Sequence, residues 1–334
     1  TNGKTTSTYF FRAALQPKLG KLGLLGTLEV DTGSFATFAE RTTHESPVVH
    51  RALAATAEAG LGGAVVEVSS HALSLDRVEG ILFDLAVFTN LQHDHLDFYE
   101  NSMDLYFDAK ASLFTPGVSK QGVTAVDDSY GRRLAREAAI PIQAVQALTD
   151  DAVDVGDTPL WKVQNIHADT EGGGNNFTLL SPTGVGYAAN CPIPGLVNVQ
   201  NAALALVGAM ALGVEPNAAI TALRNAPPIP GRMQWIESTP TQPTVMVDYA
   251  HTPEAIEQLL IDLRPLTKGR LVAVFGSDGD RDATKRVPLA EVVAKRADVL
   301  WVTDENPRFE DAASIRAMLL EGMSNVRPDL EDVF

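Results

Sequence analysis

The sequence predicts an α/β protein with two domains, each built around a mostly parallel sheet. Two observations support this prediction. Short apolar runs alternate with amphipathic helical segments along most of the chain, a pattern typical of parallel sheets covered by helices. A stretch rich in proline and glycine, 227–234, interrupts the alternation, which then starts again. The 334 residues suit two domains of ordinary size, and we expect them at 1–230 and 231–334.

Composition excludes several classes of protein. Hydrophobic residues make up 45% and charged residues 20% of the chain, which is usual for a globular protein. The net charge of −16 argues against a nucleic-acid partner, which needs a basic surface. No apolar run reaches the roughly 18–20 residues of a membrane span, and the single cysteine, Cys191, excludes an internal disulfide. We therefore expect a cytoplasmic protein in a reducing compartment, without a membrane span.

The chain begins with TNGKTTSTYFF, in which Gly3, Lys4 and Thr5 match the last three positions of the phosphate-binding pattern G-x-x-x-x-G-K-[ST]. Apolar residues at helical spacing over 9–15 predict a helix directly after them. A loop that leads into a helix N-terminus is suited to binding anions. The alternative is a capped helix with an unrelated lysine. If the loop binds phosphate, we expect a partial sequence that starts inside its nucleotide site.

The other elements of the first domain are predicted from apolar runs and helix-end signals. Strands bounded by turn residues are expected at 22–27, 63–70, 81–91, 122–128 and 141–145. Helices are expected at 47–60, 102–114, 130–139, 199–213 and 216–226. Between these two groups, 151–190 contains three short strands separated by turn residues, which indicates an antiparallel addition to the sheet.

The second domain has a simpler alternation. Each predicted strand precedes a predicted helix. The strands are expected at 244–250, 270–276 and 299–304, and the helices at 253–264, 288–297 and 312–323. This order predicts a small Rossmann-like sheet.

Polar residues gather where strands of the first domain end, which is where ligands bind in open α/β sheets. Glu67 lies in an apolar strand, where a carboxylate is costly unless it is paired or bound to metal. His93, Asp94, His95 and Asp97 follow the next strand. Oxygen ligands in such a cluster suit a hard cation such as Mg²⁺. The alternative is a salt-bridged Glu67 beside solvated loop residues.

Three successive strands of the second domain also end in polar clusters. The clusters are DYAHTPE at 248–254, GSDGDRDATKR at 276–286 and DENPRFED at 304–311. One such loop is usually solvated surface. Three of them at the same edge of a sheet indicate a lined cleft.

Six motifs occur in order along the chain: T-N-G-K-T-T, E-V-S-S-H-A-L, N-L-x-x-D-H-L-D, Y-A-H-T-P, G-D-R-D-x-x-K-R and D-x-N-P-R. Together they resemble the Mur ligases of peptidoglycan synthesis, and most of all the MurE branch. That family has a UDP-sugar domain, a central ATPase domain and a C-terminal Rossmann-like domain. The resemblance implies that 1–230 is the central P-loop ATPase domain and that 231–334 is most of the third. The N-terminal UDP-binding domain and the C-terminal end are expected to lie outside this chain.

The resemblance implies an ATP-dependent ligase that acts as a monomer on small molecules. The expected reaction adds meso-diaminopimelate to UDP-N-acetylmuramoyl-L-Ala-D-Glu through an acyl phosphate. A carboxylate becomes an acyl donor only when its oxygen can leave, so catalysis is mostly positioning and charge neutralisation. Three alternatives stay open: an L-lysine-adding enzyme, another amide ligase similar to folylpolyglutamate or cyanophycin synthetase, and an inactive nucleotide-binding fragment.

The resemblance also implies roles for single residues in ATP and metal binding. The catalytic roles are expected for Lys4, Glu67, His95 and Lys110. Nucleotide contacts are expected from Asn2, Gly3, Lys4, Thr5, Thr6, Asn198, Asn201, Arg232, Asp248 and His251. Two Mg²⁺ sites are expected, with ligands from Thr5, Glu67, His95 and Lys110. A carbamate on Lys110 would turn a cation into an oxygen ligand.

Substrate contacts are implied in the same way. The muramyl peptide is expected to meet Thr42, Thr43, Ser69 and Arg77. The amino acid is expected to meet Arg281, Glu305, Asn306, Pro307 and Arg308. The guanidinium of Arg308 can grip the extra carboxylate of diaminopimelate with two hydrogen bonds, which lysine cannot offer. Two positions depart from the family pattern, His44 where proline is common and Glu305 where aspartate is usual.

Overall fold

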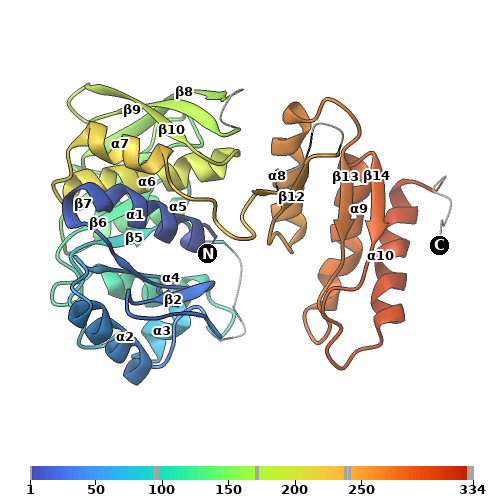
Figure 1. Cartoon of the computed structure of the whole chain (residues 1–334), viewed down its shortest axis with the longest axis horizontal. Coiled ribbons are helices and arrows are strands. Elements are labelled where there is room, and N and C mark those ends of the chain that lie inside the picture. Colours follow the sequence, from blue (N-terminus) through green and yellow to red (C-terminus); the bar gives the residue numbers. More distant parts are fainter. Residues whose placement is uncertain are drawn as a thin grey trace. The chain divides into compact units, whose positions relative to one another are not determined.

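The computed structural model describes residues 2–92, 96, 98–169, 173–236, 239 and 242–328. The chain divides into a larger unit, Thr1–Val245, and a smaller unit, Met246–Phe334 (Figure 1). The domain boundary expected after residue 230 stays a prediction. Among the described residues, no helix is both long and apolar enough to cross a bilayer.

The larger unit contains two sheets. The first has the order β3-β2-β1-β4, from β1 (Gly23–Leu25), β2 (Glu29–Asp31), β3 (Ala36–Phe38) and β4 (Ala64–Val66). The second has the order β10-β9-β8-β7-β6-β5, from β5 (Ala86–Phe88), β6 (Gly122–Ala125), β7 (Ile142–Gln146), β8 (Leu160–Ala168), β9 (Asn175–Leu180) and β10 (Gly186–Cys191). The pairs β1–β4 and β5 through β8 are parallel, and the outer pairs are antiparallel. The predicted α/β class is confirmed.

Helices cover these sheets: α1 (Lys4–Leu19), α2 (Ser46–Glu58), α3 (Ser70–Ser74), α4 (Met103–Ala111), α5 (Ser129–Glu137), α6 (Leu196–Ala211) and α7 (Pro216–Arg224). The helix α6 is buried without a break from Val199 to Ala209. It packs with Val123 and Val145 in the main core, whereas Ala144 packs with Ala135 of α5. Because neighbouring strand residues point to opposite faces, α6 and α5 cover opposite faces of the second sheet.

The smaller unit is built from α8 (Pro253–Leu263), β13 (Val272–Phe275), α9 (Arg286–Arg296), β14 (Val299–Val302) and α10 (Ala312–Val326). The strands β13 and β14 pair in parallel. The core of this unit includes Leu289, Val293 and Leu319, all at most 1% exposed. The short strands β11 (Gln234–Ile236) and β12 (Val245–Val247) lie between the two cores in sequence.

Several strands are shorter than the sequence predicts. The strand predicted over 81–91 is wrong in length, because only β5 forms a ladder and Phe83 makes an isolated bridge to Ser119. The strand predicted over 63–70 ends at Val66, since Ser69 caps α3 by accepting from Ala72 N–H. The antiparallel addition is confirmed for β9 and β10, while β8 joins the sheet in parallel.

Candidate active site

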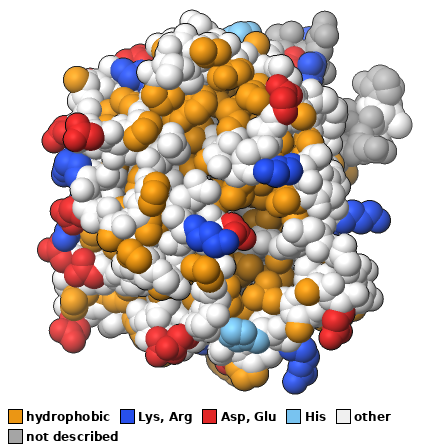
Figure 2. All heavy atoms as spheres, turned by 90° about the vertical axis from the view of Figure 1, so that its left-hand side faces the viewer, with side chains coloured by type: hydrophobic (Ala, Val, Ile, Leu, Met, Phe, Trp, Pro, Cys, Tyr) orange, Lys and Arg blue, Asp and Glu red, His pale blue; other side chains and the backbone are white. Residues whose placement is uncertain are grey.

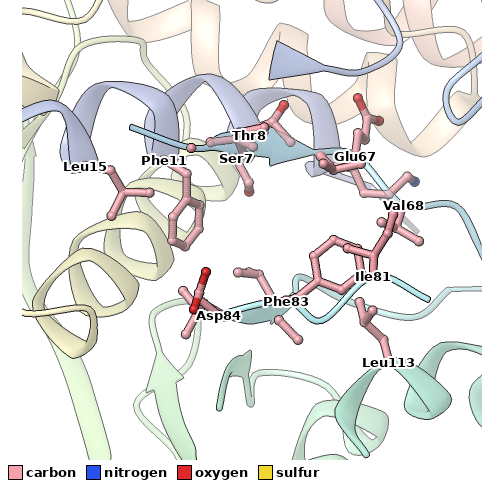
Figure 3. Close-up of a pocket in the computed structure, with 18 of the residues that line it drawn as sticks. Ser7, Thr8, Phe11, Leu15, Glu67, Val68, Ile81, Phe83, Asp84 and Leu113 are labelled. Carbon is pink, nitrogen blue, oxygen red and sulfur yellow. The ribbon is translucent and has the colours of Figure 1, made fainter. Parts of the chain in front are cut away.

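A cavity of about 530 Å³ is lined by residues of both β4 and β5, which are the end strands of the two sheets. Figure 3 shows Phe11, Ile81 and Phe83 around the open space, with Glu67 at its margin. Hydrophobic side chains also gather around a hollow on the face of the larger unit seen in Figure 2. Because Lys4 and Lys110 line the cavity together with Glu67, it brings three of the four predicted catalytic residues to one place.

The loop before α1 is held in a conformation that favours glycine. Gly3 has φ 83°, in the left-handed region. A Cβ at this position would lie 2.5 Å from Oδ1 of Asn201, a residue of α6 that is 1% exposed. The same Oδ1 accepts a hydrogen bond of 3.2 Å from the Ser7 hydroxyl, while the buried Nδ2 of Asn201 has no hydrogen-bond partner among the described residues. The loop therefore lies against a donor that a ligand at the helix N-terminus can use.

Asn2 fixes this loop to the chain that follows β5. Its backbone N–H donates to Oδ1 of Asn90 at 2.8 Å, and its Nδ2 donates to Oε1 of Gln92 at 2.7 Å. Its carbonyl accepts from the Thr89 hydroxyl at 2.7 Å and from Nδ2 of Asn90 at 3.0 Å. These hydrogen bonds anchor the loop before α1 to the segment that follows β5. Thr6 is buried in the first turn of that helix.

Glu67 directly follows β4 and is 3% exposed. Its carboxylate accepts hydrogen bonds from the Thr5 hydroxyl at 3.2 Å and from the Thr27 hydroxyl at 2.9 Å. It also accepts from Thr27 N–H at 3.0 Å. Arg232 donates to the Thr5 hydroxyl at 3.4 Å. The segments of Thr5 and Thr27 therefore meet at one buried carboxylate, and Arg232 contacts this junction through the Thr5 hydroxyl.

The predicted metal ligands are only partly described. Thr5 and Glu67 are in contact, and Lys110 lies on α4 with Nζ 4.9 Å from the ring centre of Tyr106. His95 lies outside the described residues, as do His93, Asp94 and Asp97. Within the described ranges, no three His, Cys, Asp or Glu side chains gather closely enough to hold a metal ion. The hydroxyl and carboxylate oxygens of Thr5 and Glu67 nevertheless suit a hard cation that keeps several waters.

The residues predicted for the muramyl peptide form a hydrogen-bonded group beside Glu67. The Thr43 hydroxyl donates to the Glu67 carbonyl at 2.8 Å and accepts from Ser69 N–H at 3.0 Å. Arg77 donates to the Thr43 carbonyl at 2.8 Å. The hydroxyls of Thr42 and Thr27 share a hydrogen bond of 3.1 Å. The four predicted residues are thus brought together in the larger unit, next to the predicted metal ligand.

Three predicted nucleotide contacts lie elsewhere. Asn198, in the first turn of α6, donates from Nδ2 to the Pro194 carbonyl at 2.7 Å. Asp248 and His251 belong to the smaller unit. The Asp248 carboxylate accepts from Ala250 N–H at 2.8 Å, and His251 shares a 3.0 Å hydrogen bond with the Tyr249 carbonyl.

The residues predicted for the amino acid lie on two neighbouring loops of the smaller unit. Arg281 follows β13, and the run from Glu305 to Arg308 follows β14. Both Arg281 and Arg308 are exposed. Nη2 of Arg308 lies 3.6 Å from the carboxylate of Asp278. The structure therefore brings two guanidinium-bearing loops side by side at the carboxyl ends of adjacent parallel strands.

Thr27 is a site residue that the sequence analysis missed. It provides two of the three hydrogen bonds that the Glu67 carboxylate accepts from the described residues. The one feature of the sequence that could have indicated it is its position at the end of the first predicted strand, 22–27. A threonine there is commonplace, and only the pairing of β1 with β4 brings it beside Glu67.

Comparisons with known protein families match both units. The family described as "Mur ligase middle domain" matches residues 1–209, and "Mur ligase, glutamate ligase domain" matches residues 231–334. A protein of Streptomyces coelicolor named UDP-N-acetylmuramoyl-L-alanyl-D-glutamate--2,6-diaminopimelate ligase is 40% identical over 327 residues. A UDP-N-acetylmuramyl-tripeptide synthetase of Leifsonia xyli is 40% identical over 333 residues. Each match covers 98% of this chain but only 62% and 63% of the relative, respectively.

Solved structures show the same fold. A structure titled UDP-N-acetylmuramoyl-L-alanyl-D-glutamate--2,6-diaminopimelate ligase has a TM-score of 0.68 and 28% identity, covering 99% of this chain and 64% of that one. Mycobacterium tuberculosis folylpolyglutamate synthase complexed with ADP has a TM-score of 0.71 and 20% identity, covering 97% of this chain and 77% of that one. At that identity the second likeness concerns the fold alone.

Proposed function

The chain belongs to the Mur ligase family, and we propose that it catalyses ATP-dependent amide bond formation in peptidoglycan synthesis. In the proposed reaction the γ-phosphate of ATP moves to the D-glutamate carboxylate of UDP-N-acetylmuramoyl-L-Ala-D-Glu. The amine of meso-diaminopimelate then attacks the acyl phosphate, the amide bond forms and inorganic phosphate leaves. The names of relatives at about 40% identity support this substrate pair.

The observation that carries the proposal is the junction of Thr5 with Glu67. The loop at the start of α1 offers backbone N–H groups and Lys4 to phosphate oxygens, as phosphate-binding loops do. The hydrogen bond between Thr5 and Glu67 joins that loop to a buried carboxylate. A hydroxyl and a carboxylate beside a phosphate cradle are the groups that hold Mg²⁺ with a nucleotide.

Magnesium would supply charge neutralisation at the transferring phosphoryl group. We assign Thr5 as the ligand of this chain that holds one ion, and Glu67 and His95, with a carbamate on Lys110, as ligands of a second ion. Lys110 lines the same cavity as Lys4 and Glu67, which supports this assignment. Lys4 itself holds phosphate oxygens, since an ammonium is a compact point charge.

The substrates are assigned to the two units separately. Thr42, Thr43, Ser69 and Arg77 bind the muramyl peptide, because they form one hydrogen-bonded group beside Glu67. Arg281 and the run from Glu305 to Arg308 bind the amino acid. In the larger unit, Asn198 and Asn201 are assigned to the adenine and Arg232 to ATP. In the smaller unit, Asp248 is assigned to the ribose, with His251 nearby in sequence. Because the substrates are small molecules and Cys191 is a buried free thiol, we propose a cytoplasmic monomer without a nucleic-acid partner.

Phosphate release tests the proposal. The assay contains ATP, Mg²⁺ and UDP-N-acetylmuramoyl-L-Ala-D-Glu, with either meso-diaminopimelate or L-lysine, and controls that omit each substrate in turn. Release only with diaminopimelate is the expected result. Release only with lysine would keep the ligase and overturn the assignment of Arg308. Release with neither amino acid would overturn the proposed reaction.

A further inference from the structure

Two loops of the smaller unit are tied together as one body. Loop 276–282 follows β13 and loop 304–311 follows β14, its parallel neighbour. Gly279 N–H donates to the Asn306 carbonyl at 2.8 Å. A Cβ at Gly279 would clash with the carbonyl oxygen of Pro307. The backbones of the two loops are therefore in direct contact, next to residues that are proposed to bind the amino acid.

A buried arginine lies beneath this contact. Arg286 is the first residue of α9 and the largest fully buried side chain of the described chain. Its Nη1 lies 2.8 Å from one carboxylate oxygen of Glu310, and its Nη2 lies 3.1 Å from the other. Nη2 also donates to the Asp278 carbonyl at 3.1 Å. The planar guanidinium therefore connects both loops through a two-pronged pair, a geometry that lysine cannot reproduce.

Glu310 extends the connection to the backbone of the other loop. One carboxylate oxygen accepts from Asp280 N–H at 2.7 Å. The Asp280 carboxylate in turn accepts from Phe309 N–H at 3.1 Å. The hydrogen bonds from Arg286 and Asp280 N–H hold the pKa of Glu310 below its ordinary value. The carboxylate thus stays ionised, as the buried arginine requires.

The residue held by this arrangement is Arg308. Its φ of 50° lies in the left-handed region, which a residue with a side chain adopts only when its surroundings determine it. Its N–H donates to Oδ1 of Asn306 at 3.2 Å. Phe309 and Glu310, the next two residues, carry the bonds to Asp280 and Arg286. The conformation of Arg308 is therefore fixed from both sides.

We propose that Arg286 and Glu310 are positioning residues for amino-acid recognition, which hold Arg308 and the loop bearing Arg281 in one arrangement. Arg286 is buried and acts through Glu310 rather than on the substrate. The proposal rests on the proposed function only for the identity of the amino acid. The bracing of the two loops by Arg286 and Glu310 can be tested without any substrate.

The first test is amide hydrogen exchange of the ligand-free protein, read by NMR. Glu310→Gln keeps the side-chain size but removes the charge that pairs with Arg286. The exchange of the Asp280, Phe309 and Gly279 amides is expected to speed up by about tenfold or more, because they lose bonds within the brace. The amides of β13 are expected to keep their protection. Glu257→Gln is the matched control, since Glu257 pairs with Arg296 at 2.6 Å on an exposed surface.

The second test separates positioning from a general loss of structure. In the full-length enzyme, Glu310→Gln is expected to raise KM for the amino acid by about tenfold or more. KM for ATP and for the muramyl peptide is expected to change less than about twofold, because their assigned residues lie outside these loops. Asp280→Gly gives a second variant, since Asp280 is exposed and has φ 50°, which glycine tolerates. It is expected to show the same selective rise in KM with unchanged thermal stability.

Arg286→Lys completes the set. It keeps the positive charge but loses the two-pronged pair, so we expect the same rise in KM for the amino acid as in Glu310→Gln. The double variant is expected to raise this KM little more than either single change does. Unchanged exchange in Glu310→Gln, or equal effects on all three KM values, would overturn the proposal. If the enzyme uses neither amino acid, the exchange experiment still decides whether the brace exists, so failure of the proposed function is recognised separately.

Discussion

The hydroxyl of Thr5 donates a 3.2 Å hydrogen bond to the buried carboxylate of Glu67, which joins the first turn of α1 to the end of β4. Glu67 is 3% exposed and has no salt-bridge partner among the described residues. Its carboxylate oxygens accept from the hydroxyls of Thr5 and Thr27 and from Thr27 N–H. A buried carboxylate that accepts only hydroxyl and N–H donors within the described part of the chain is suited to receive a metal ion.

Glu67→Gln is expected to lower turnover by about 100-fold or more, because it removes the charge that neutralises a cation at the phosphoryl group. The neutral amide keeps the volume and can still accept from Thr27. The measurement is phosphate release over a range of Mg²⁺ concentrations. The control is Glu137→Gln, which removes an exposed partner of Arg133. An unchanged kcat in Glu67→Gln would contradict the assigned metal role.

Gly3→Ala is expected to weaken nucleotide binding and to destabilise the fold by more than the backbone conformation alone would cost. The backbone term, about 1 kcal/mol, comes from placing a side chain at positive φ. The added term comes from the clash with Oδ1 of Asn201. Gly184→Ala isolates the first term, since Gly184 has φ 84° and no atom within 4 Å of an added Cβ. Urea unfolding measures the loss of stability, and nucleotide titration measures the loss of affinity. Equal losses of stability in Gly3→Ala and Gly184→Ala would count against a close approach of Gly3 to Asn201.

Lys110→Ala is expected to reduce turnover and to regain part of it when short carboxylic acids are added. The physical reason is that a carbamate supplies oxygen ligands, which a small carboxylate in the cavity can replace. Lys120→Ala is the control, since Lys120 pairs with Asp84 at 2.6 Å on the surface. Its turnover is expected to stay unchanged, with or without added carboxylic acids. A fully active Lys110→Ala enzyme would rule out the bridging role.

Arg308→Ala is expected to lower kcat/KM for diaminopimelate by about 10- to 100-fold, the usual value of a charged hydrogen-bonded contact. Arg308→Lys should recover little of this loss, because an ammonium cannot form the two-pronged contact. ATP binding, measured by titration calorimetry, should stay within about twofold of the parent. Parallel losses of ATP and amino-acid binding would show that Arg308 does not recognise the amino acid.

Cys191 is expected to resist thiol reagents at pH 8 in the folded protein and to react once the chain is unfolded in urea. Burial raises the pKa of its thiol to about 12, since the thiolate would lose its hydration. An unfolded thiol ionises near pH 9. Between these values only the unfolded state releases the proton, so the contribution to stability falls as the pH rises from 9 towards 12. Rapid labelling of the folded protein at pH 8 would disagree with the buried position.

The helices were more predictable from the sequence than the short strands. The helix α6 was predicted at 199–213 and runs over Leu196–Ala211, because its apolar residues continue over four turns. The three-residue strands β2 and β3 were not predicted. Their ladder depends on cross-strand partners such as Val30 and Thr37, and three residues hold too little periodicity to reveal a strand.

Some residues of the candidate site could also be predicted from the sequence, and others could not. Lys4 and Glu67 could be selected from local pattern, as a lysine before a helix and a carboxylate in an apolar strand. Lys110 could not, because a lysine on a helix is commonplace, and only the resemblance to the family pointed to it. Thr27 was not selected, and Glu310 was selected only as one member of the polar cluster at 304–311, without a role of its own. Their partners lie 40 residues away at Glu67 and 24 residues away at Arg286, so their roles arise from tertiary contacts.

The cavity between β4 and β5 also exposes one side of the backbone of β4. Glu67 N–H donates to the Leu25 carbonyl, so by the alternation of a parallel ladder the backbone groups of Val66 point the other way, away from β1. Among the described residues, no strand continues either sheet on the cavity side. An unpaired edge is a template for extended segments of other molecules. The backbone of β4 on the side that faces the cavity is therefore suited to pair with an extended segment.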